Sequence, residues 1–277
     1  MPMREVFYKV IDGQHLQLDF HPPKEQKYEK TPVLIYYHGG GFREGHRKNT
    51  AMFQKTIDTM TAEGFAFATV SYRFSTPQKG AFPDSVKDSN DAIRVLADPK
   101  NGFNIDPDNI FLTGFSAGAT LALFGALTQD KYTDFENPYP YKIKGVFSMS
   151  GSTTFDYRRL TTFYDDLDQV LHEYLGKTPY QDESIYHESS TLTYLKQRKA
   201  LDTAFFLMAG ENDIVVPCQM ADFFEEEALK QGYNCEKLIL KNASHSFLVI
   251  ENEVEIRDVG FINNQLIGFV RKHFGQK

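Results

Sequence analysis

Residues 110–123 read IFLTGFSAGATLAL, and this stretch decides the fold. Its apolar opening, IFLT, predicts a buried strand, and its final run, ATLAL, favours a helix. Between them, Gly114, Ser116 and Gly118 form the pattern G-x-S-x-G. A serine on such a sharp strand-to-helix turn projects its hydroxyl above the sheet, and the flanking glycines leave room for the turn. We therefore predict that Ser116 is a nucleophile.

Apolar strands and helical segments alternate on both sides of this stretch. We expect strands at 33–37, 65–72, 109–115, 143–149, 204–208 and 238–240, and helices at 52–62, 84–96, 117–127, 219–230 and 259–273. Two earlier strands, 6–10 and 16–20, flank Asp12-Gly13, a dipeptide typical of tight hairpins. Strands that alternate with helices form a mostly parallel sheet with helices on both faces. The prediction is one α/β domain, residues 1–277, with an antiparallel N-terminal edge.

The segment 152–200 interrupts the alternation. It contains no convincing strand, and its aromatic residues are scattered among many charges. A long insertion of this kind in a sheet protein usually covers the active-site end. We expect residues 152–200 to form a small cap or lid, and a surface insertion without a role in substrate binding is the alternative.

The composition excludes several classes of protein. Hydrophobic residues make up 41% and charged residues 24% of the 277-residue chain, which is ordinary for a soluble globular protein. The net charge of −7 argues against nucleic acid or an anionic membrane as a partner. The N-terminal residues MPMREVFYKV lack the features of a signal peptide, and no apolar run approaches the roughly 18 residues of a membrane helix. We expect a cytoplasmic protein.

Cysteines and metal-binding patterns are scarce. Cys218 and Cys235 are the only cysteines, and two cysteines in a chain of this length predict reduced thiols rather than a disulfide framework. The patterns G-x-x-x-x-G-K-[ST], H-E-x-x-H and C-x-x-C do not occur. We therefore expect no metal site.

A second glycine motif, HGGG at residues 38–41, follows the third predicted strand. Acyl transfer passes through an oxyanion that backbone N–H groups must face, and glycines let the backbone come close. We expect the N–H groups of Gly40, Gly41 and Ala117 to form this oxyanion hole. His38 is expected to hold the loop by hydrogen bonds rather than to act as a base.

A serine hydroxyl needs a base, and His245 is the best candidate. Three histidines follow Ser116 before the terminal helix: His172, His187 and His245. The first two lie in the predicted cap. His245 follows the predicted strand 238–240, at the carboxyl edge where sheets of this kind place their sites.

The base must be held in one tautomer by an acid, which should leave the preceding strand. That strand, 204–208, is followed by Glu211 and Asp213. We select Asp213 because the following residues read as a loop that enters the next helix. Glu211 is the alternative.

Several motifs occur together in a recognisable order. They are HGGGF at 38–42, VSYR at 70–73, FP at 82–83, GFSAG at 114–118, GENDIVVP at 210–217 and ASHSF at 243–247. The chain resembles the esterase and lipase branch of the α/β hydrolases that carries HGGG, and it is similar to compact esterases near the prolyl-oligopeptidase-type peptidases. The resemblance implies an α/β-hydrolase fold and hydrolysis of small carboxylic esters through an acyl-enzyme, without a cofactor.

The sequence also departs from these families. Hormone-sensitive-lipase-like members usually have an acidic residue before the serine, where this chain has Phe115. Because the region before Val33 is short, we expect no large N-terminal cap. The Tyr72-Arg73 pair, common in the family, is expected to anchor loops, with recognition of a substrate carboxylate as the alternative.

The sequence does not identify the substrate. The same residues could cleave amides, as in a formamidase, deacetylase or peptidase, and a catalytically silent relative that only binds a ligand is the alternative of another class. A small ester is the expected partner, with neither nucleic acid nor membrane. No substrate-binding residue is predicted, and a homodimer is left open.

Overall fold

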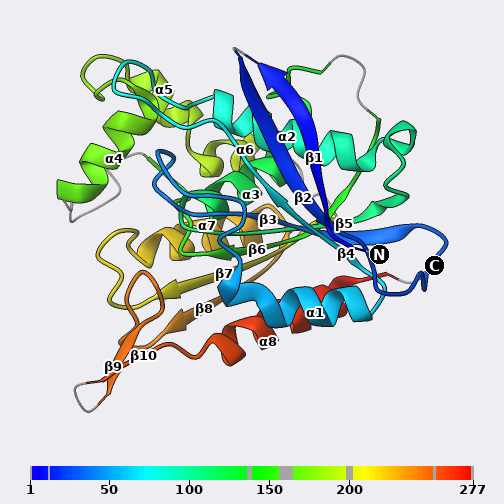
Figure 1. Cartoon of the computed structure of the whole chain (residues 1–277). Coiled ribbons are helices and arrows are strands. Elements are labelled where there is room, and N and C mark those ends of the chain that lie inside the picture. The colour runs from blue at the N-terminus through cyan, green and yellow to red at the C-terminus, as the bar shows by residue number, and fades with distance from the viewer. Residues whose placement is uncertain are drawn as a thin grey trace.

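The computed structural model describes residues 2–11, 13–135, 139–155, 165–197, 202–251 and 254–275 (Figure 1). Its strands are β1 (Arg4–Ile11), β2 (Gln14–His21), β3 (Thr31–Tyr37), β4 (Ala66–Val70), β5 (Ile105–Phe115), β6 (Ile143–Met149), β7 (Ala204–Gly210), β8 (Asn234–Leu240), β9 (Val249–Glu251) and β10 (Val254–Ile256). Its helices are α1 (Gln54–Ala62), α2 (Asp84–Ala97), α3 (Ala117–Leu127), α4 (Asp165–Leu175), α5 (Glu183–Glu188), α6 (Thr191–Gln197), α7 (Gln219–Lys230) and α8 (Val259–His273). Two single-turn 3₁₀ helices, η1 (Ala51–Phe53) and η2 (Pro99–Asn101), complete the set.

Eight strands form one mixed sheet in the order β1-β2-β4-β3-β5-β6-β7-β8. The pairs β1–β2 and β2–β4 are antiparallel, and all other neighbours in this sheet are parallel. This confirms the predicted class, a mostly parallel sheet with an antiparallel N-terminal edge. Asp12 of the predicted hairpin turn lies outside the described residues.

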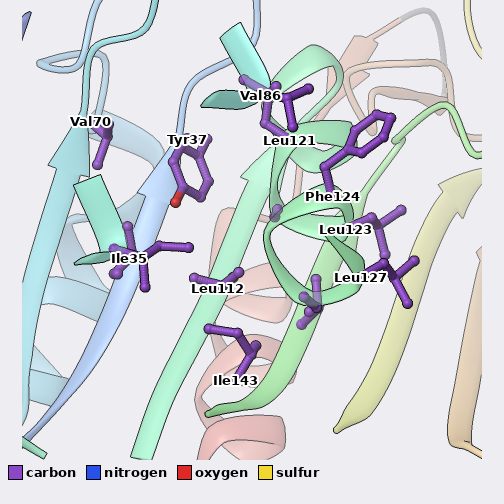
Figure 2. Close-up of a cluster of buried hydrophobic side chains, with 14 of the residues drawn as sticks. Ile35, Tyr37, Val70, Val86, Leu112, Leu121, Leu123, Phe124, Leu127 and Ile143 are labelled. Atoms are coloured by element: carbon purple, nitrogen blue, oxygen red, sulfur yellow. The ribbon is translucent and has the colours of Figure 1, made fainter. Parts of the chain in front are cut away.

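Helices cover both faces of the sheet, as predicted. Figure 1 shows α1 and α8 side by side on one face and α2, α3, α6 and α7 on the other. In Figure 2, Ile35, Leu112 and Ile143 of three strands lie beside Leu121 and Phe124 of α3. These side chains are almost completely buried, and their removal from water stabilises the layers.

An ionic cluster fastens the edge strand β1 to α2. The Lys9 ammonium lies 2.8 Å from Asp88, 2.7 Å from Asp91 and 2.6 Å from Asp134. Burial alone would lower the pKa of Lys9, but these carboxylates outweigh it and raise the pKa. The Arg73 guanidinium donates to Asp88 from Nε at 2.7 Å, so Arg73 anchors the loop after β4. This is the structural role expected for Arg73 from the sequence.

We expect Lys9→Met to lower the free energy of unfolding by about 3–5 kcal/mol, because it removes the cation that the buried Asp91 binds and one of the two cations that Asp88 binds. Chemical denaturation would measure the loss. Lys24→Met is the matched control, since the Lys24–Asp58 pair is exposed at 3.7 Å and such pairs contribute less than about 1 kcal/mol. Equal losses in the two variants would contradict a structural role for the cluster.

Some elements differ from the sequence-based prediction. β5 begins at Ile105, earlier than the predicted start at residue 109. Its first five residues, IDPDN, were missed because they are mostly polar and contain a proline. β8 begins at Asn234, four residues before the predicted start at residue 238. The earlier residues were missed because an edge strand keeps part of its surface in water and so lacks a continuous apolar run. The hairpin β9–β10 was not predicted, since strands of three residues carry no periodic signal. Cys218 and Cys235 are both free thiols, as predicted.

The described part of the predicted cap consists of helices and loops. It contains α4, α5 and α6, and residues 156–164 and 198–200 lie outside the described part. Both α6 and α4 contribute to the main core, and α4 also approaches the end of the sheet near Ser116 through Val170 and Leu171. Within the described residues, none of the helices is both long enough and apolar enough to cross a bilayer.

Candidate active site

Ser116 occupies a strained turn between β5 and α3. Its backbone has φ 54° and ψ −122°, and its N–H donates to the carbonyl oxygen of Met149 at 2.8 Å. A methyl group at Gly118 would lie 2.1 Å from the carbonyl oxygen of Tyr37, and one at Gly114 would lie 2.3 Å from the carbonyl carbon of Gly118. The two glycines are therefore required by the close approach of the elements, and the turn projects Ser116 at the carboxyl edge of the sheet.

His245 lies in the loop after β8 and contacts Ser116 directly. Its Nε2 is 2.9 Å from the Ser116 hydroxyl oxygen, and its Nδ1 is 2.7 Å from a carboxylate oxygen of Asp213. A carboxylate accepts hydrogen bonds, so the proton is on Nδ1 and Nε2 can accept from the serine. The Ser150 hydroxyl donates to the carbonyl oxygen of His245 at 3.1 Å and holds the loop in place.

Asp213 is held firmly behind the histidine. Its side chain is fully buried, and its second carboxylate oxygen accepts from the N–H groups of Val215 at 2.9 Å and Val216 at 2.7 Å. Glu211, the alternative acid, instead accepts from the N–H of Asn242 at 2.9 Å. The structure therefore brings Asp213, and not Glu211, to the imidazole.

The glycine loop, residues 38–45, borders Ser116 on another side. Gly40 has φ 127° and Gly41 has φ 58°, and a methyl group at Gly40 would lie 2.0 Å from the carbonyl oxygen of Glu44. Among the described residues, no acceptor binds the N–H groups of Gly40, Gly41 or Ala117. Three donors close to a serine hydroxyl are thus available for a developing oxyanion.

His38 holds the start of this loop. Its Nδ1 donates to the carbonyl oxygen of Gly39 at 2.7 Å, and its ring stacks on Tyr72 with centroids 4.5 Å apart. The Tyr72 hydroxyl donates to the carbonyl oxygen of His38 at 2.7 Å. Burial lowers the pKa of His38 to about 4, so the imidazole is neutral at physiological pH. These contacts match the loop-holding role expected for His38.

A cavity of about 250 Å³, the Ser116 cavity, opens over the hydroxyl and the imidazole. Its apolar walls are Phe115 and Ala117, which flank Ser116 in the chain, and five further residues: Phe42, Val170, Leu171, Val215 and Val216. Val170 and Leu171 belong to α4, so the predicted cap contributes to the wall. Sequence reasoning missed all five residues, because an apolar residue that lines a cavity has the same pattern as one that packs in the core.

Helix α4 also packs on the glycine loop. The rings of Phe42 and Tyr174 stack with centroids 3.7 Å apart, and Arg43 forms an ion pair with Glu173 at 2.7 Å. The Tyr174 carbonyl oxygen accepts from the N–H of Ala81 at 2.8 Å. The helix that forms part of the cavity wall therefore also supports the loop that carries the free N–H groups.

The fold has close structural neighbours. The apo form of Thermogutta terrifontis esterase 2 superposes with a TM-score of 0.77, covering 99% of this chain and 97% of that one at 19% identity. The same esterase phosphorylated by paraoxon gives a TM-score of 0.76 at 19% identity, with 99% and 96% covered. These likenesses establish the α/β-hydrolase fold.

The relatives found by sequence are longer than this chain. A probable isoprenylcysteine alpha-carbonyl methylesterase of Oryza sativa subsp. japonica is 23% identical over 90% of this chain and 60% of its own length. The probable carboxylic ester hydrolase LipM of Mycobacterium tuberculosis is 24% identical over 71% of this chain and 44% of its own length. The chain thus spans about half the length of these relatives. The BD-FAE family model matches residues 18–228, and the chain therefore belongs to the BD-FAE family.

Proposed function

We propose that this protein is a serine hydrolase that cleaves small carboxylic esters through an acyl-enzyme. The observation that carries the proposal is the hydrogen-bonded series Asp213–His245–Ser116, which lies beside the free N–H groups of the glycine loop. A hydroxyl joined to an imidazole, which is itself oriented by a carboxylate, is the arrangement that activates serine for acyl transfer.

The chemistry follows from these positions. Ser116 attacks the ester carbonyl while His245 Nε2 accepts its proton, and Asp213 stabilises the imidazolium that results. The N–H groups of Gly40, Gly41 and Ala117 bind the oxyanion of the tetrahedral intermediate. His245 then protonates the departing alcohol, and water repeats the sequence to release the acid.

The names of the relatives support an ester rather than an amide. The rice relative is called a methylesterase, LipM a carboxylic ester hydrolase, and the structural neighbour an esterase that paraoxon phosphorylates. Paraoxon is an electrophile that an activated nucleophile attacks. An amide hydrolase with the same residues is the comparison that the experiment must include.

We expect the p-nitrophenyl esters with short acyl chains, from acetate to butyrate, to be hydrolysed faster than p-nitroacetanilide. Each methylene that the Ser116 cavity accommodates contributes about 0.8 kcal/mol, or roughly fourfold in kcat/KM. A series of acyl chains up to octanoate, measured beside the anilide, tests this. Faster cleavage of the anilide would identify an amide hydrolase, and no turnover together with no labelling by a fluorophosphonate probe would identify a silent ligand-binding relative.

A further inference from the structure

A second cavity, of about 450 Å³, adjoins the Ser116 cavity and has a different chemical character. Its lining comprises Tyr36, His38, Gly39, Gly40, Glu44, Gly45, Asn49, Met52, Phe53, Phe115, Ser246 and Arg257. We call it the Arg257 cavity. It shares Gly40, Glu44 and Phe115 with the Ser116 cavity.

The Arg257 cavity is lined by residues that adjoin Ser116 and His245. A methyl group at Gly39 would lie 3.4 Å from Cβ of Ser116, and Ser246 directly follows His245. Phe115 lines both cavities, and the centroid of its ring lies 5.2 Å from that of the His245 ring. An ester bound at Ser116 has two arms, so one arm can enter each cavity.

Tyr36 contributes an unused donor to this cavity. The residue is 3% exposed, and its hydroxyl binds no other group among the described residues. Its ring packs on Phe53 with centroids 4.5 Å apart. Burial raises the pKa of the phenol, so it keeps its proton and remains a donor. The Tyr36 hydroxyl remains accessible to water from the cavity, so a ligand acceptor would take the place of that water.

Arg257 supplies a positive charge to the same cavity. It lies between β10 and α8, is exposed, and forms no ion pair within the described ranges. Asn49 and Ser246 add polar groups to the lining. Glu44 is the one acidic residue of the lining, and it is also exposed toward the Ser116 cavity. A guanidinium that is free to form two parallel hydrogen bonds is well suited to a carboxylate.

We propose that the Arg257 cavity binds a carboxylate on one arm of the ester substrate. This inference rests on the proposed function. Arg257 binds the carboxylate, the Tyr36 hydroxyl donates to an oxygen deeper in the cavity, and Met52, Phe53 and Phe115 pack against the apolar part of the same arm. The substrate is then an ester of a hydroxy acid or a half-ester of a dicarboxylic acid, and the experiment distinguishes the two.

Two matched pairs of esters test the proposal. The acetyl esters of 4-hydroxybenzoate and 4-hydroxybenzamide differ by a charge on the alcohol arm, and the mono-p-nitrophenyl ester of adipate and that of adipamic acid differ by a charge on the acyl arm. For each pair, the ratio of kcat/KM for the anionic ester to that for the neutral ester is measured. We expect Arg257→Gln to lower this ratio about tenfold in one pair, the loss of one charge-assisted contact.

Tyr36→Phe is expected to lower the same ratio about threefold, because it removes one neutral hydrogen bond. Added salt should lower the ratio in the wild type and not in Arg257→Gln. The control is Lys55→Gln, which removes an equal charge from α1, where Lys55 binds Asn264 at 2.8 Å. Lys55→Gln should leave the ratio unchanged.

The outcomes separate this inference from the proposed function. If the neutral esters are hydrolysed but Arg257→Gln changes neither ratio more than Lys55→Gln does, the carboxylate assignment is wrong and the esterase proposal stands. If p-nitrophenyl acetate is hydrolysed but none of the four esters is, the carboxylate assignment alone is wrong, and if p-nitrophenyl acetate is not hydrolysed either, both proposals fail. A change in the alcohol pair identifies an ester of a hydroxy acid, and a change in the acyl pair identifies a half-ester.

Discussion

Ser116→Ala is expected to lower kcat for ester hydrolysis by a factor on the order of 10⁶. The variant removes the hydroxyl that the proposed mechanism acylates, so His245 and Asp213 have no nucleophile to activate. Residual hydrolysis over the reaction in water should come from binding and from the free N–H groups of the glycine loop. Steady-state rates with p-nitrophenyl acetate measure the loss.

Labelling by a fluorophosphonate probe provides a second readout for Ser116. The wild type should be labelled, and Ser116→Ala should not. Ser184→Ala, on the exposed helix α5, is the matched control and should be labelled like the wild type. A thermal melt shows that each variant is folded. Equal labelling of Ser116→Ala and the wild type would assign the nucleophile to another residue.

Asp213→Asn is expected to lower kcat by a factor on the order of 10⁴. The Asp213 carboxylate accepts the Nδ1 proton of His245 at 2.7 Å, whereas an amide can donate to Nδ1 and favour the tautomer whose Nε2 carries the proton. That tautomer cannot accept from Ser116. The amide oxygen of asparagine can still accept from the N–H of Val216, so the loop should keep its fold.

Glu211→Gln is the matched control for the acid. Its amide oxygen can still accept from the N–H of Asn242, so near wild-type rates are expected. Rates of both variants with p-nitrophenyl acetate decide between the two acids. If Asp213→Asn stays near the wild type and Glu211→Gln loses activity, the acid is Glu211.

The architecture could be predicted where local signals and burial agree. The bounds of β6, α3, α7 and α8 match the predicted ranges, because each is apolar or amphipathic along its whole length. Edge and rim elements were shortened or missed, because their residues are partly solvated and lose the periodic pattern. β8 and the hairpin β9–β10 are examples.

The candidate site residues could be predicted from the sequence for a shared physical reason. Glycines at close approaches, and polar residues directly after buried strands, stand out from the surrounding pattern. The structure brings His245 within hydrogen-bond distance of both Ser116 and Asp213, with Gly40 and Gly41 beside Ser116.

The cavity walls carried no such signal. Val170 of α4 and Tyr36 of β3 look like ordinary core residues, and only the three-dimensional packing turns them toward Ser116 or the Arg257 cavity. Arg257 follows a hairpin that the sequence did not reveal. The shape and charge of the two cavities therefore depend on contacts between segments that are distant in the sequence, and a single sequence does not show these contacts.

The packing of α4 on the glycine loop limits how this protein can be remodelled. The stacked Phe42 and Tyr174 rings and the Arg43–Glu173 ion pair join the wall of the Ser116 cavity to the glycine loop. A helix transplanted from a relative would bring new cavity walls and also a foreign support for the glycine loop. An exchange with a relative should therefore replace α4 and residues 38–45 together, because the contacts between these two segments are then kept.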